Sequence, residues 1–210
     1  MKITKFVHSC LLVETPGRVA LFDPGVMSTG SIDIDATTQL DDIFITHIHQ
    51  DHIDIDFVES LVKKFPNVRI TSTNDVVELL KSRNIKAQAE PPEGVTFFNS
   101  PHEDVRPLFD TPPEEQGVHY LGILSHPGDS HSFTETKDIL ALPMTAPWGN
   151  SIRALNIALD MKPKHVLPIH DWHWREEARE GSYAQFEKLL GEQNITFHKL
   201  KTGEPIEIDI

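Results

Sequence analysis

The sequence predicts an α/β fold in which helices flank two β-sheets. Short β-rich segments stand near both ends of the chain, and strand patterns alternate with helical patterns between them. Residues 42–46 form the continuous apolar run of a strand that is buried on both faces. The chain has 210 residues, and domains mostly contain about 100–200 residues. We therefore expect one domain spanning residues 1–210.

The first half of the chain begins with strand patterns and continues with helical ones. Pro16-Gly17 is typical of a hairpin turn between strands, and Asn74 is a good N-cap for a helix. An earlier helix shows apolar residues at helical spacing and ends at Pro66-Asn67. Strands are expected at residues 2–14, 18–24, 42–46 and 68–73, and helices at residues 53–65 and 74–84.

The second half begins with a proline-rich segment at residues 89–117 that has no long periodic run. We expect this segment to be a loop interrupted by one strand, and long loops in compact domains are commonly functional. Beyond it, strands and helices alternate again. Strands are expected at residues 95–100, 117–126, 137–144, 165–170, 195–200 and 205–210, and helices at residues 150–160 and 175–190.

The charge of the chain argues against a nucleic-acid or membrane partner. It has 19 basic and 32 acidic side chains, which give a formal net charge of −13, the wrong sign for binding phosphate backbones or an anionic membrane surface. No apolar run approaches the roughly 20 residues of a membrane helix, and the N-terminal residues lead directly into a strand pattern. We expect a soluble, unprocessed protein that acts on a small-molecule substrate. The sequence leaves open whether it forms a homo-oligomer.

The single cysteine and the many histidines indicate a different chemistry from that of disulfide-rich proteins. Cys10 has no second cysteine to pair with, which excludes internal disulfides and cysteine-rich zinc sites and indicates the reducing cytoplasm. By its pattern Cys10 faces the core as an inert thiol. Against this one cysteine stand 12 histidines, the side chain that titrates near neutral pH and binds metals.

The strongest motif follows the apolar strand directly. Residues 47–52 contain His47, His49, Asp51 and His52, on a turn where side chains can converge. Neutral imidazole suits zinc, iron, copper and manganese, and a carboxylate can bridge or cap a hard cation. The alternative is a polar turn with chance histidines, but so many partly buried polar groups would be costly without a ligand.

Further polar residues stand at the ends of other expected strands. They are Asp23, His102, Asp129 and His170. In open sheets, ligands gather beyond the carboxyl ends of strands, so these positions support one shared cleft. Motifs of competing enzyme classes are absent from the sequence, including the GxSxG elbow, the phosphate-binding loop and GxGxxG.

With these motifs, the sequence resembles the metallo-β-lactamase superfamily of metal-dependent hydrolases over nearly its whole length. The HxHxDH block at residues 47–52 is the hallmark of that family. The opening strands resemble a small branch that includes ascorbate-phosphate lactonase-like proteins and uncharacterised hydrolases. The segments HPGDS, LPMTAPW and LPIHD resemble the uncharacterised members. The resemblance implies an αββα sandwich of two mixed β-sheets flanked by helices, with a binuclear metal site at the sandwich edge.

The resemblance also implies the metal ligands. One metal would take His47, His49 and His102, the other would take Asp51, His52 and His170, and Asp129 would bridge the two. Asp23 would support the ligands from behind. Zinc is the expected divalent ion, and manganese or iron would suit the same donors. Asp51 and Asp129 are the expected catalytic carboxylates, and Asp129 would position the water that attacks the substrate.

The sequence leaves open the roles of several aromatic and imidazole side chains. His119 competes with His102 as a ligand, although it lies inside an expected strand. The other positions fall into three groups: His8, His126, His131 and His173, each near the expected ligands or the cleft; His165 and His198, expected to be structural or exposed; and Trp148, Trp172 and Trp174, expected to pack or to line a pocket rim.

The expected function is the hydrolysis of a small-molecule ester, lactone, amide or phosphodiester bond by water activated at two divalent metals. Two alternatives use the same ligands. One is an iron-binding redox or oxygen-handling protein, and the other is a metal-binding domain without turnover.

Overall fold

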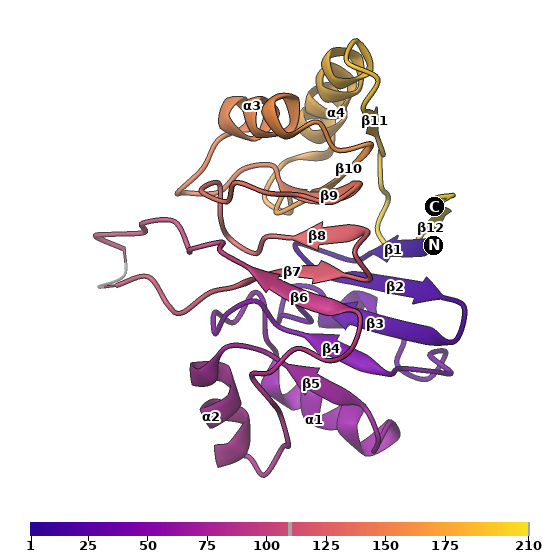
Figure 1. The fold of residues 1–210 in the computed structure, drawn as a ribbon, viewed down its shortest axis with the longest axis vertical. Coiled ribbons are helices and arrows are strands. Elements are labelled where there is room, and N and C mark those ends of the chain that lie inside the picture. Colours follow the sequence, from indigo (N-terminus) through magenta and orange to yellow (C-terminus); the bar gives the residue numbers. More distant parts are fainter. Residues whose placement is uncertain (109–110, 210) are drawn as a thin grey trace. The chain divides into compact units, whose positions relative to one another are not determined.

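Figure 1 shows the computed structural model, which describes residues 1–108 and 111–209. The chain divides into two compact units. The first unit comprises Met1–Glu93 and Leu200–Ile210, and the second comprises Gly94–Lys199. Each unit contains one six-stranded sheet.

The sheet of the first unit has the strand order β12-β1-β2-β3-β4-β5. The strands from β12 to β3 are antiparallel, and β3, β4 and β5 are parallel, so the sheet is mixed. Its elements are β1 (Lys2–Lys5), β2 (Leu11–Thr15), β3 (Arg18–Phe22), β4 (Asp42–Phe44), α1 (Ile55–Lys64), β5 (Arg69–Thr71), α2 (Asn74–Ser82) and β12 (Pro205–Glu207).

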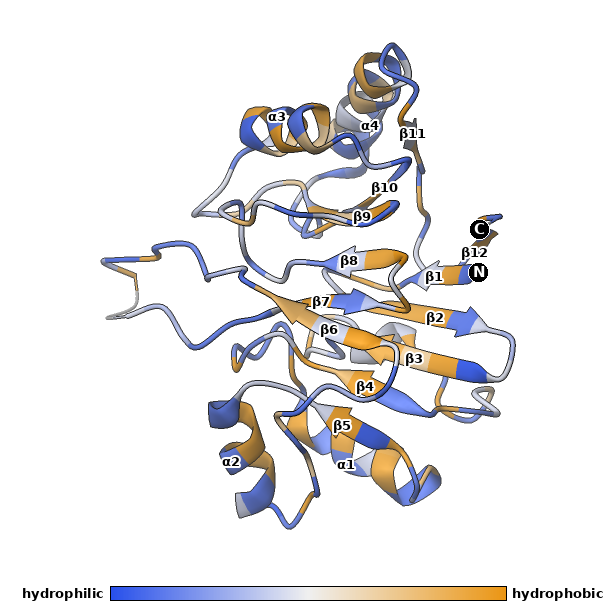
Figure 2. Ribbon diagram, viewed as in Figure 1, coloured by the Kyte–Doolittle hydropathy of each residue, from blue (hydrophilic) through white to orange (hydrophobic). Residues whose placement is uncertain are grey.

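Helices α1 and α2 pack on this sheet through one apolar side each. Val58 and Leu61 of α1 and Val76 and Leu80 of α2 are buried in one core cluster with the sheet residues Ile43 and Ile70. Figure 2 shows apolar and polar positions alternating along both helices, the pattern expected of helices with one buried side. Burial of these side chains holds both helices against the sheet of the first unit.

The expected strand at residues 2–14 is two strands. The chain turns back at residues 6–10, where the Phe6 amide donates to the Cys10 carbonyl at 2.9 Å, and β1 and β2 then pair antiparallel. His8 occupies a left-handed conformation with φ 65° in this turn. Sequence alternation cannot show this reversal because neither Gly nor Pro marks it. The N-cap of α2 is Thr73 rather than the expected Asn74, a shift of one residue.

The sheet of the second unit has the order β11-β10-β9-β8-β7-β6. It is also mixed, because β8 to β11 are parallel and β6, β7 and β8 are antiparallel. Its elements are β6 (Val95–Phe98), β7 (Gly117–Tyr120), β8 (Leu124–His126), β9 (Ile139–Pro143), α3 (Ser151–Met161), β10 (His165–Ile169), α4 (Glu176–Gly191) and β11 (Thr196–Phe197). The expectation of an α/β chain with two mixed sheets and helices is confirmed.

The expected strand at residues 117–126 is the hairpin β7-β8. Leu121 and Gly122 form its turn with φ values of 53° and 66°, and positive φ at both central residues is the geometry of a tight hairpin turn. Leucine rarely adopts this conformation, so its sequence predicts a continuous strand instead. The hairpin places His119 opposite Ser125.

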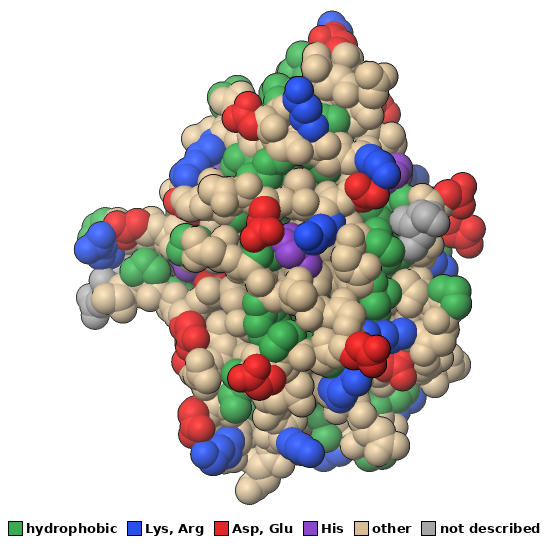
Figure 3. All heavy atoms as spheres, viewed as in Figure 1, with side chains coloured by type: hydrophobic (Ala, Val, Ile, Leu, Met, Phe, Trp, Pro, Cys, Tyr) green, Lys and Arg blue, Asp and Glu red, His purple; other side chains and the backbone are tan. Residues whose placement is uncertain are grey.

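Within residues 1–108 and 111–209, no helix is long and apolar enough to cross a membrane. On the face drawn in Figure 3, acidic and basic side chains are interspersed rather than gathered by sign.

Candidate metal centre

The first group of expected ligands follows β4, whose parallel neighbours are β3 and β5. Asp23 comes directly after β3, and its amide donates to the Phe44 carbonyl at 2.9 Å. The Ile45 amide donates to the Thr71 carbonyl of β5 at 3.1 Å. These bonds continue the ladder past the strand ends. They fix the start of the turn at residues 46–52, which carries three expected imidazole ligands.

Asp23 is fully buried and holds this turn through hydrogen bonds. Its carboxylate accepts hydrogen bonds from the Thr46 amide at 2.8 Å and the Thr46 hydroxyl at 2.9 Å. His52 Nδ1 lies 2.7 Å from Asp23 Oδ2. Because a carboxylate only accepts, His52 Nδ1 carries the hydrogen and Nε2 keeps its lone pair. Asp23 therefore selects the His52 tautomer that can bind a metal through Nε2.

His47 and His49 direct ring nitrogens toward each other. His47 is fully buried, and its Nε2 lies 3.1 Å from His49 Nδ1. Two nitrogens bound to one tetrahedral zinc at the usual 2.0–2.1 Å would lie about 3.3 Å apart. On the other side of the ring, His47 Nδ1 lies 3.1 Å from Thr46 Oγ1. The separation of the two nitrogens fits a pair of imidazoles that share one cation.

Asp51 lies against His8 of the first unit. His8 Nε2 is 3.1 Å from Asp51 Oδ2, and the His8 side chain is 1% exposed. The His8 ring also meets His52 edge-on, with centroids 5.2 Å apart. The sequence left the role of His8 open, and the structure places it beside an expected ligand.

A close approach between two backbone segments explains why position 25, shortly after Asp23, is a glycine. A Cβ at Gly25 would lie 1.9 Å from the Asp51 carbonyl oxygen. The two segments are also joined by hydrogen bonds from the Val26 amide to the Gln50 carbonyl at 2.8 Å and from the Asp54 amide to the Pro24 carbonyl at 2.9 Å. Only glycine permits this close backbone approach, which sets the position of Asp51.

The second group of expected ligands lies in the second unit around Asp129. His170 Nε2 is 3.1 Å from both carboxylate oxygens of Asp129, and His102 Nε2 is 3.9 Å from Oδ2. All three residues are buried. His170 follows β10, Asp129 follows β8 and His102 follows β6, so three loops bring the group together.

Hydrogen bonds fix both imidazoles of this group in one tautomer. His170 Nδ1 donates to the Thr145 carbonyl at 2.8 Å, and His102 Nδ1 donates to the Glu103 carbonyl at 2.7 Å. In the neutral rings, Nε2 then carries a lone pair that faces a carboxylate. Two acceptors that face each other need a cation or an additional proton between them. The chemistry of this donor set therefore fits a bound metal ion.

His119 lies elsewhere in the second unit. Its Nδ1 is 2.9 Å from Ser125 Oγ, its Nε2 is 3.4 Å from a Glu135 oxygen, and its ring stacks on Phe98 with centroids 4.1 Å apart. Burial lowers the pKa of His119. The unit thus brings His102, and not His119, to Asp129, while the choice of ligand remains a prediction.

The remaining histidines have other surroundings. His126 accepts a hydrogen bond from the Gly128 amide at 3.3 Å, and His173 is exposed. His165 and His198 are half-buried and lie side by side, with Nδ1 of the first 3.1 Å from Nε2 of the second. Both lie in the second unit on or beside β10 and β11.

Sequence reasoning missed the hydrogen-bonding roles of the side chains around Asp129. Glu115 Oε1 accepts a hydrogen bond from the Asp129 amide, and Trp148 Nε1 donates to Asp129 Oδ2 at 3.3 Å. Glu103 accepts from the His131 amide at 2.9 Å and pairs with Arg153. Burial opposes ionisation of Glu103, but hydrogen bonds from Ser132 and the His131 amide, together with the Arg153 charge, lower its pKa. These residues lie mainly on loops, where no periodic pattern could identify them.

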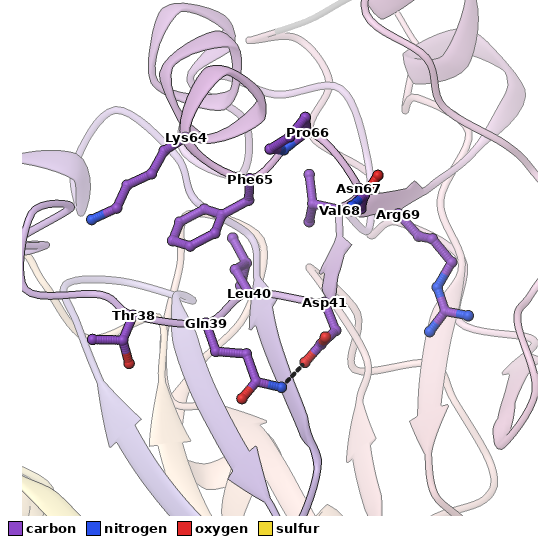
Figure 4. A pocket seen from close by; sticks show the side chains of 10 residues that line it. All are labelled: Thr38, Gln39, Leu40, Asp41, Lys64, Phe65, Pro66, Asn67, Val68 and Arg69. Atoms are coloured by element: carbon purple, nitrogen blue, oxygen red, sulfur yellow. Dashed lines mark hydrogen bonds between the residues drawn. The ribbon is translucent and has the colours of Figure 1, made fainter.

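A separate surface pocket of the first unit contains none of the expected ligands (Figure 4). It lies where the chain enters β4 and β5, at the opposite end of these strands from His47 and His52. Gln39 donates to Asp41 across it at 2.7 Å. Its lining residues are Thr38, Gln39, Leu40, Asp41, Lys64, Phe65, Pro66, Asn67, Val68 and Arg69.

The comparison of the sequence with known families gives a match to the Beta-lactamase superfamily domain over residues 2–170. The chain belongs to the metallo-β-lactamase superfamily. The matched range runs from the first residue of β1 to His170 and includes every expected ligand. The expected family is therefore confirmed.

Sequence alignments with relatives cover most of the chain. Protein Rv0786c of Mycobacterium tuberculosis is 30% identical and aligns with 94% of this chain and 100% of its own length. The UPF0173 metal-dependent hydrolase SSP1060 of Staphylococcus saprophyticus is 27% identical and aligns with 81% of this chain and 85% of its own length.

Solved structures share the metallo-β-lactamase fold with this chain. Igni18, a metallo hydrolase from Ignicoccus hospitalis, superposes with a TM-score of 0.75 at 18% identity over 100% of this chain and 98% of its own. CmlA, a diiron β-hydroxylase from Streptomyces venezuelae, superposes with a TM-score of 0.68 at 15% identity over 99% of this chain and 54% of its own. At these identities the likeness concerns the fold alone.

Proposed function

We propose that this protein is a metal-dependent hydrolase that cleaves an ester, lactone, amide or phosphodiester bond of a small molecule. In this proposal, His47, His49 and His102 hold one divalent cation. Asp51, His52 and His170 hold a second, and Asp129 bridges them. Membership of the metallo-β-lactamase superfamily supports the proposal, as does the relative SSP1060, whose name is metal-dependent hydrolase.

The tautomers of the expected ligands are the observation that carries the proposal. His52 donates Nδ1–H to Asp23, and His102 and His170 donate theirs to carbonyl oxygens. Metal-binding histidines almost always donate the second ring N–H to a carboxylate, a carbonyl or water, which orients the ring and makes the ligand more basic. A set of buried rings fixed in this way supports metal binding better than histidine content alone.

The side chains of the two groups would divide the work of hydrolysis. When bound, the metal ions would lower the pKa of water and polarise the carbonyl or phosphoryl oxygen of the substrate. Asp129 would orient the attacking water and accept its proton at a carboxylate oxygen. The Glu115 and Trp148 hydrogen bonds hold Asp129 for that task. Asp51, beside His8, would keep its carboxylate directed at the second cation.

An iron-dependent oxidation is the second candidate, because imidazole and carboxylate donors also suit iron and CmlA, which shares the fold, is a diiron β-hydroxylase. Metal identity and reaction type separate the two candidates. Hydrolysis consumes only water, whereas hydroxylation requires dioxygen and a reductant.

Elemental analysis combined with a substrate screen tests the proposal. We expect the purified protein to hold about two divalent metal equivalents, and the His47→Ala/His49→Ala variant to lose at least one of them. His165→Ala is the matched control, because this half-buried histidine belongs to neither ligand group. The screen covers lactone, phosphodiester, thioester and amide substrates under air and under nitrogen. A folded protein without metal that takes up neither zinc nor manganese would contradict the proposal, and turnover that requires dioxygen would favour the iron candidate.

A further inference from the structure

Trp148 occupies a position around Asp129 that packing alone does not explain. Its indole Nε1 donates to Asp129 Oδ2 at 3.3 Å. Its ring lies among three imidazoles of the same unit, with centroid distances of 5.3 Å to His170, 5.1 Å to His131 and 6.5 Å to His102. The indole therefore touches the expected bridging carboxylate and both expected imidazole ligands of the second unit.

A tight turn sets the position of this indole. The turn is closed by paired hydrogen bonds between Ala146 and Gly149, at 3.2 Å from the Ala146 amide and 3.1 Å from the Gly149 amide. Pro147 and Trp148 are its central residues, and proline at the first central position presets the φ that such turns need. These bonds hold the backbone at Trp148 in a closed turn of four residues, from Ala146 to Gly149.

His131 packs against this turn. Its Nε2 donates to the Pro143 carbonyl at 2.8 Å, and its amide donates to Glu103 at 2.9 Å, so both the ring and the backbone are fixed. A Cβ at Gly149 would lie 2.9 Å from Cε1 and Nδ1 of this ring. The absence of a side chain at Gly149 lets the turn rest directly on the imidazole, and the same imidazole meets the Trp148 ring edge-on.

The chemistry of indole limits what Trp148 can do. Its N–H is a donor only, and it neither binds metals nor transfers protons near neutral pH. A carboxylate has about four acceptor sites on its two oxygens. A fixed donor on Oδ2 uses one of them and restricts the rotation of the group about Cβ–Cγ. The remaining sites then keep a constant direction.

We propose that Trp148 is a positioning residue for metal binding, in which the indole N–H holds Asp129 in the orientation that bridges two cations. This inference rests on the proposed function, because it concerns how the ligands retain the metal. Hydrogen-bond partners of metal ligands typically contribute about 10-fold to 100-fold to metal affinity. Trp148→Phe keeps an aromatic ring but removes the donor, so we expect it to weaken metal binding by about that factor.

The experiment measures the dissociation constants of zinc by competition with a chromophoric chelator. It compares wild type, Trp148→Phe, Asp129→Asn and the double variant. Trp172→Phe is the matched control, because Trp172 is an aromatic residue of the same unit that is 45% exposed. If Trp148 acts through Asp129, its substitution has little further effect once Asp129 is asparagine, because the two changes are then not additive.

Two further measurements check the folding of the variants and the geometry of the metal ligands. Circular dichroism checks that each variant is folded, and benzothienylalanine at position 148, which has the shape of tryptophan with sulfur in place of N–H, replaces Trp148→Phe if that variant unfolds. The visible spectrum of the cobalt-loaded protein reports the geometry of the metal ligands. We expect this spectrum to change in Trp148→Phe and to match wild type in Trp172→Phe.

The outcomes separate this inference from the proposed function. Wild type that binds no metal overturns both. Wild type that binds metal together with Trp148→Phe of unchanged affinity overturns the role of Trp148 alone. If Trp148→Phe lowers zinc affinity equally in wild type and in Asp129→Asn, Trp148 contributes by general packing. This result also overturns the proposed role of Trp148.

Discussion

His52 donates its Nδ1 hydrogen to the buried carboxylate of Asp23 across 2.7 Å. The two residues stand 29 positions apart in the sequence, and the parallel pairing of β3 with β4 brings them together. Asp23 also accepts hydrogen bonds from the Thr46 amide and the Thr46 hydroxyl. One carboxylate thus fixes the start of the ligand turn and the tautomer of its last histidine.

Replacement of Asp23 should therefore weaken metal binding without removing any ligand. In Asp23→Asn, the amide can donate to His52 Nδ1, which moves the ring hydrogen to Nε2 and blocks that nitrogen as a ligand. We expect zinc affinity to fall by about 10-fold to 100-fold, measured by chelator competition. Asp35→Asn, at an exposed aspartate of the same unit, should bind zinc as wild type does. Equal affinity of wild type and Asp23→Asn would show that Asp23 does not control the tautomer.

Asp129→Asn should separate an enzyme from a passive metal-binding protein. Asparagine is nearly the same size but neutral, so the fold should persist while the attacking water loses its orienting group and proton acceptor. Such effects each contribute about 10²–10⁴-fold, so we expect the rate of hydrolysis at saturating metal to fall at least a hundredfold. Asp138→Asn, at an exposed position of the same unit, is the control. Activity within a few-fold of wild type would place Asp129 away from the reacting centre.

Gly25→Ala tests whether close backbone approach sets the position of Asp51. The added methyl group would overlap the Asp51 carbonyl oxygen, 1.9 Å away, and would force the two segments apart. Overpacking of this kind destabilises proteins by about 1–3 kcal/mol, and the displaced Asp51 should also bind its cation less tightly. Gly30→Ala is the control, because a Cβ there meets nothing within 4 Å. Urea unfolding and metal content are the measurements, and equal results for the two variants would show that the close approach at Gly25 does not set the position of Asp51.

The His165–His198 pair predicts a pH dependence of stability outside the ligand groups. Burial lowers the pKa of His165, and burial together with the neighbouring His165 lowers the pKa of His198. Lys164 also lowers the pKa of His165, whereas Asp138 raises it. In the unfolded chain both imidazoles titrate near about 6.5. As the pH falls below that value, the unfolded state binds protons that the folded state resists, so the free energy of unfolding decreases.

Urea unfolding between pH 5 and pH 8 tests this linkage. We expect wild type to lose stability as the pH falls through about 6.5 and the His165→Gln/His198→Gln variant to lose less over the same range. His173→Gln, at an exposed histidine of the same unit, should retain most of the wild-type slope. Parallel curves for wild type and the double variant would contradict the assignment.

Local sequence patterns predicted the parts of this protein that depend on short segments. The apolar run before His47 predicted β4, and the helical spacing after His52 predicted α1, because both features lie within one window of sequence. The hairpin at Leu121 escaped prediction because leucine rarely adopts the positive φ that it has there. The turn at His8 escaped because neither Gly nor Pro marks the reversal there, although His8 has a positive φ.

The residues that support the ligands were harder to predict than the ligands themselves. The role of Asp23 followed from family resemblance, and its contacts with Thr46 and His52 appear only once β3 and β4 are paired. Glu115 and Trp148 reach Asp129 from loops, where side-chain direction depends on tertiary structure and not on periodicity. Trp148 was expected to pack or to line a pocket rim, and the hydrogen bond from its indole to Asp129 was not anticipated.

Anomalous diffraction from crystals of the zinc-loaded protein tests the proposed pair of metal sites and their ligands. We predict two zinc peaks about 3.5–4 Å apart, one bound by His47, His49 and His102, the other by Asp51, His52 and His170, with Asp129 between them. Zinc–nitrogen distances should be about 2.0–2.1 Å. A single zinc bound by other residues, or His119 in place of His102 at that distance, would contradict the proposed ligand set.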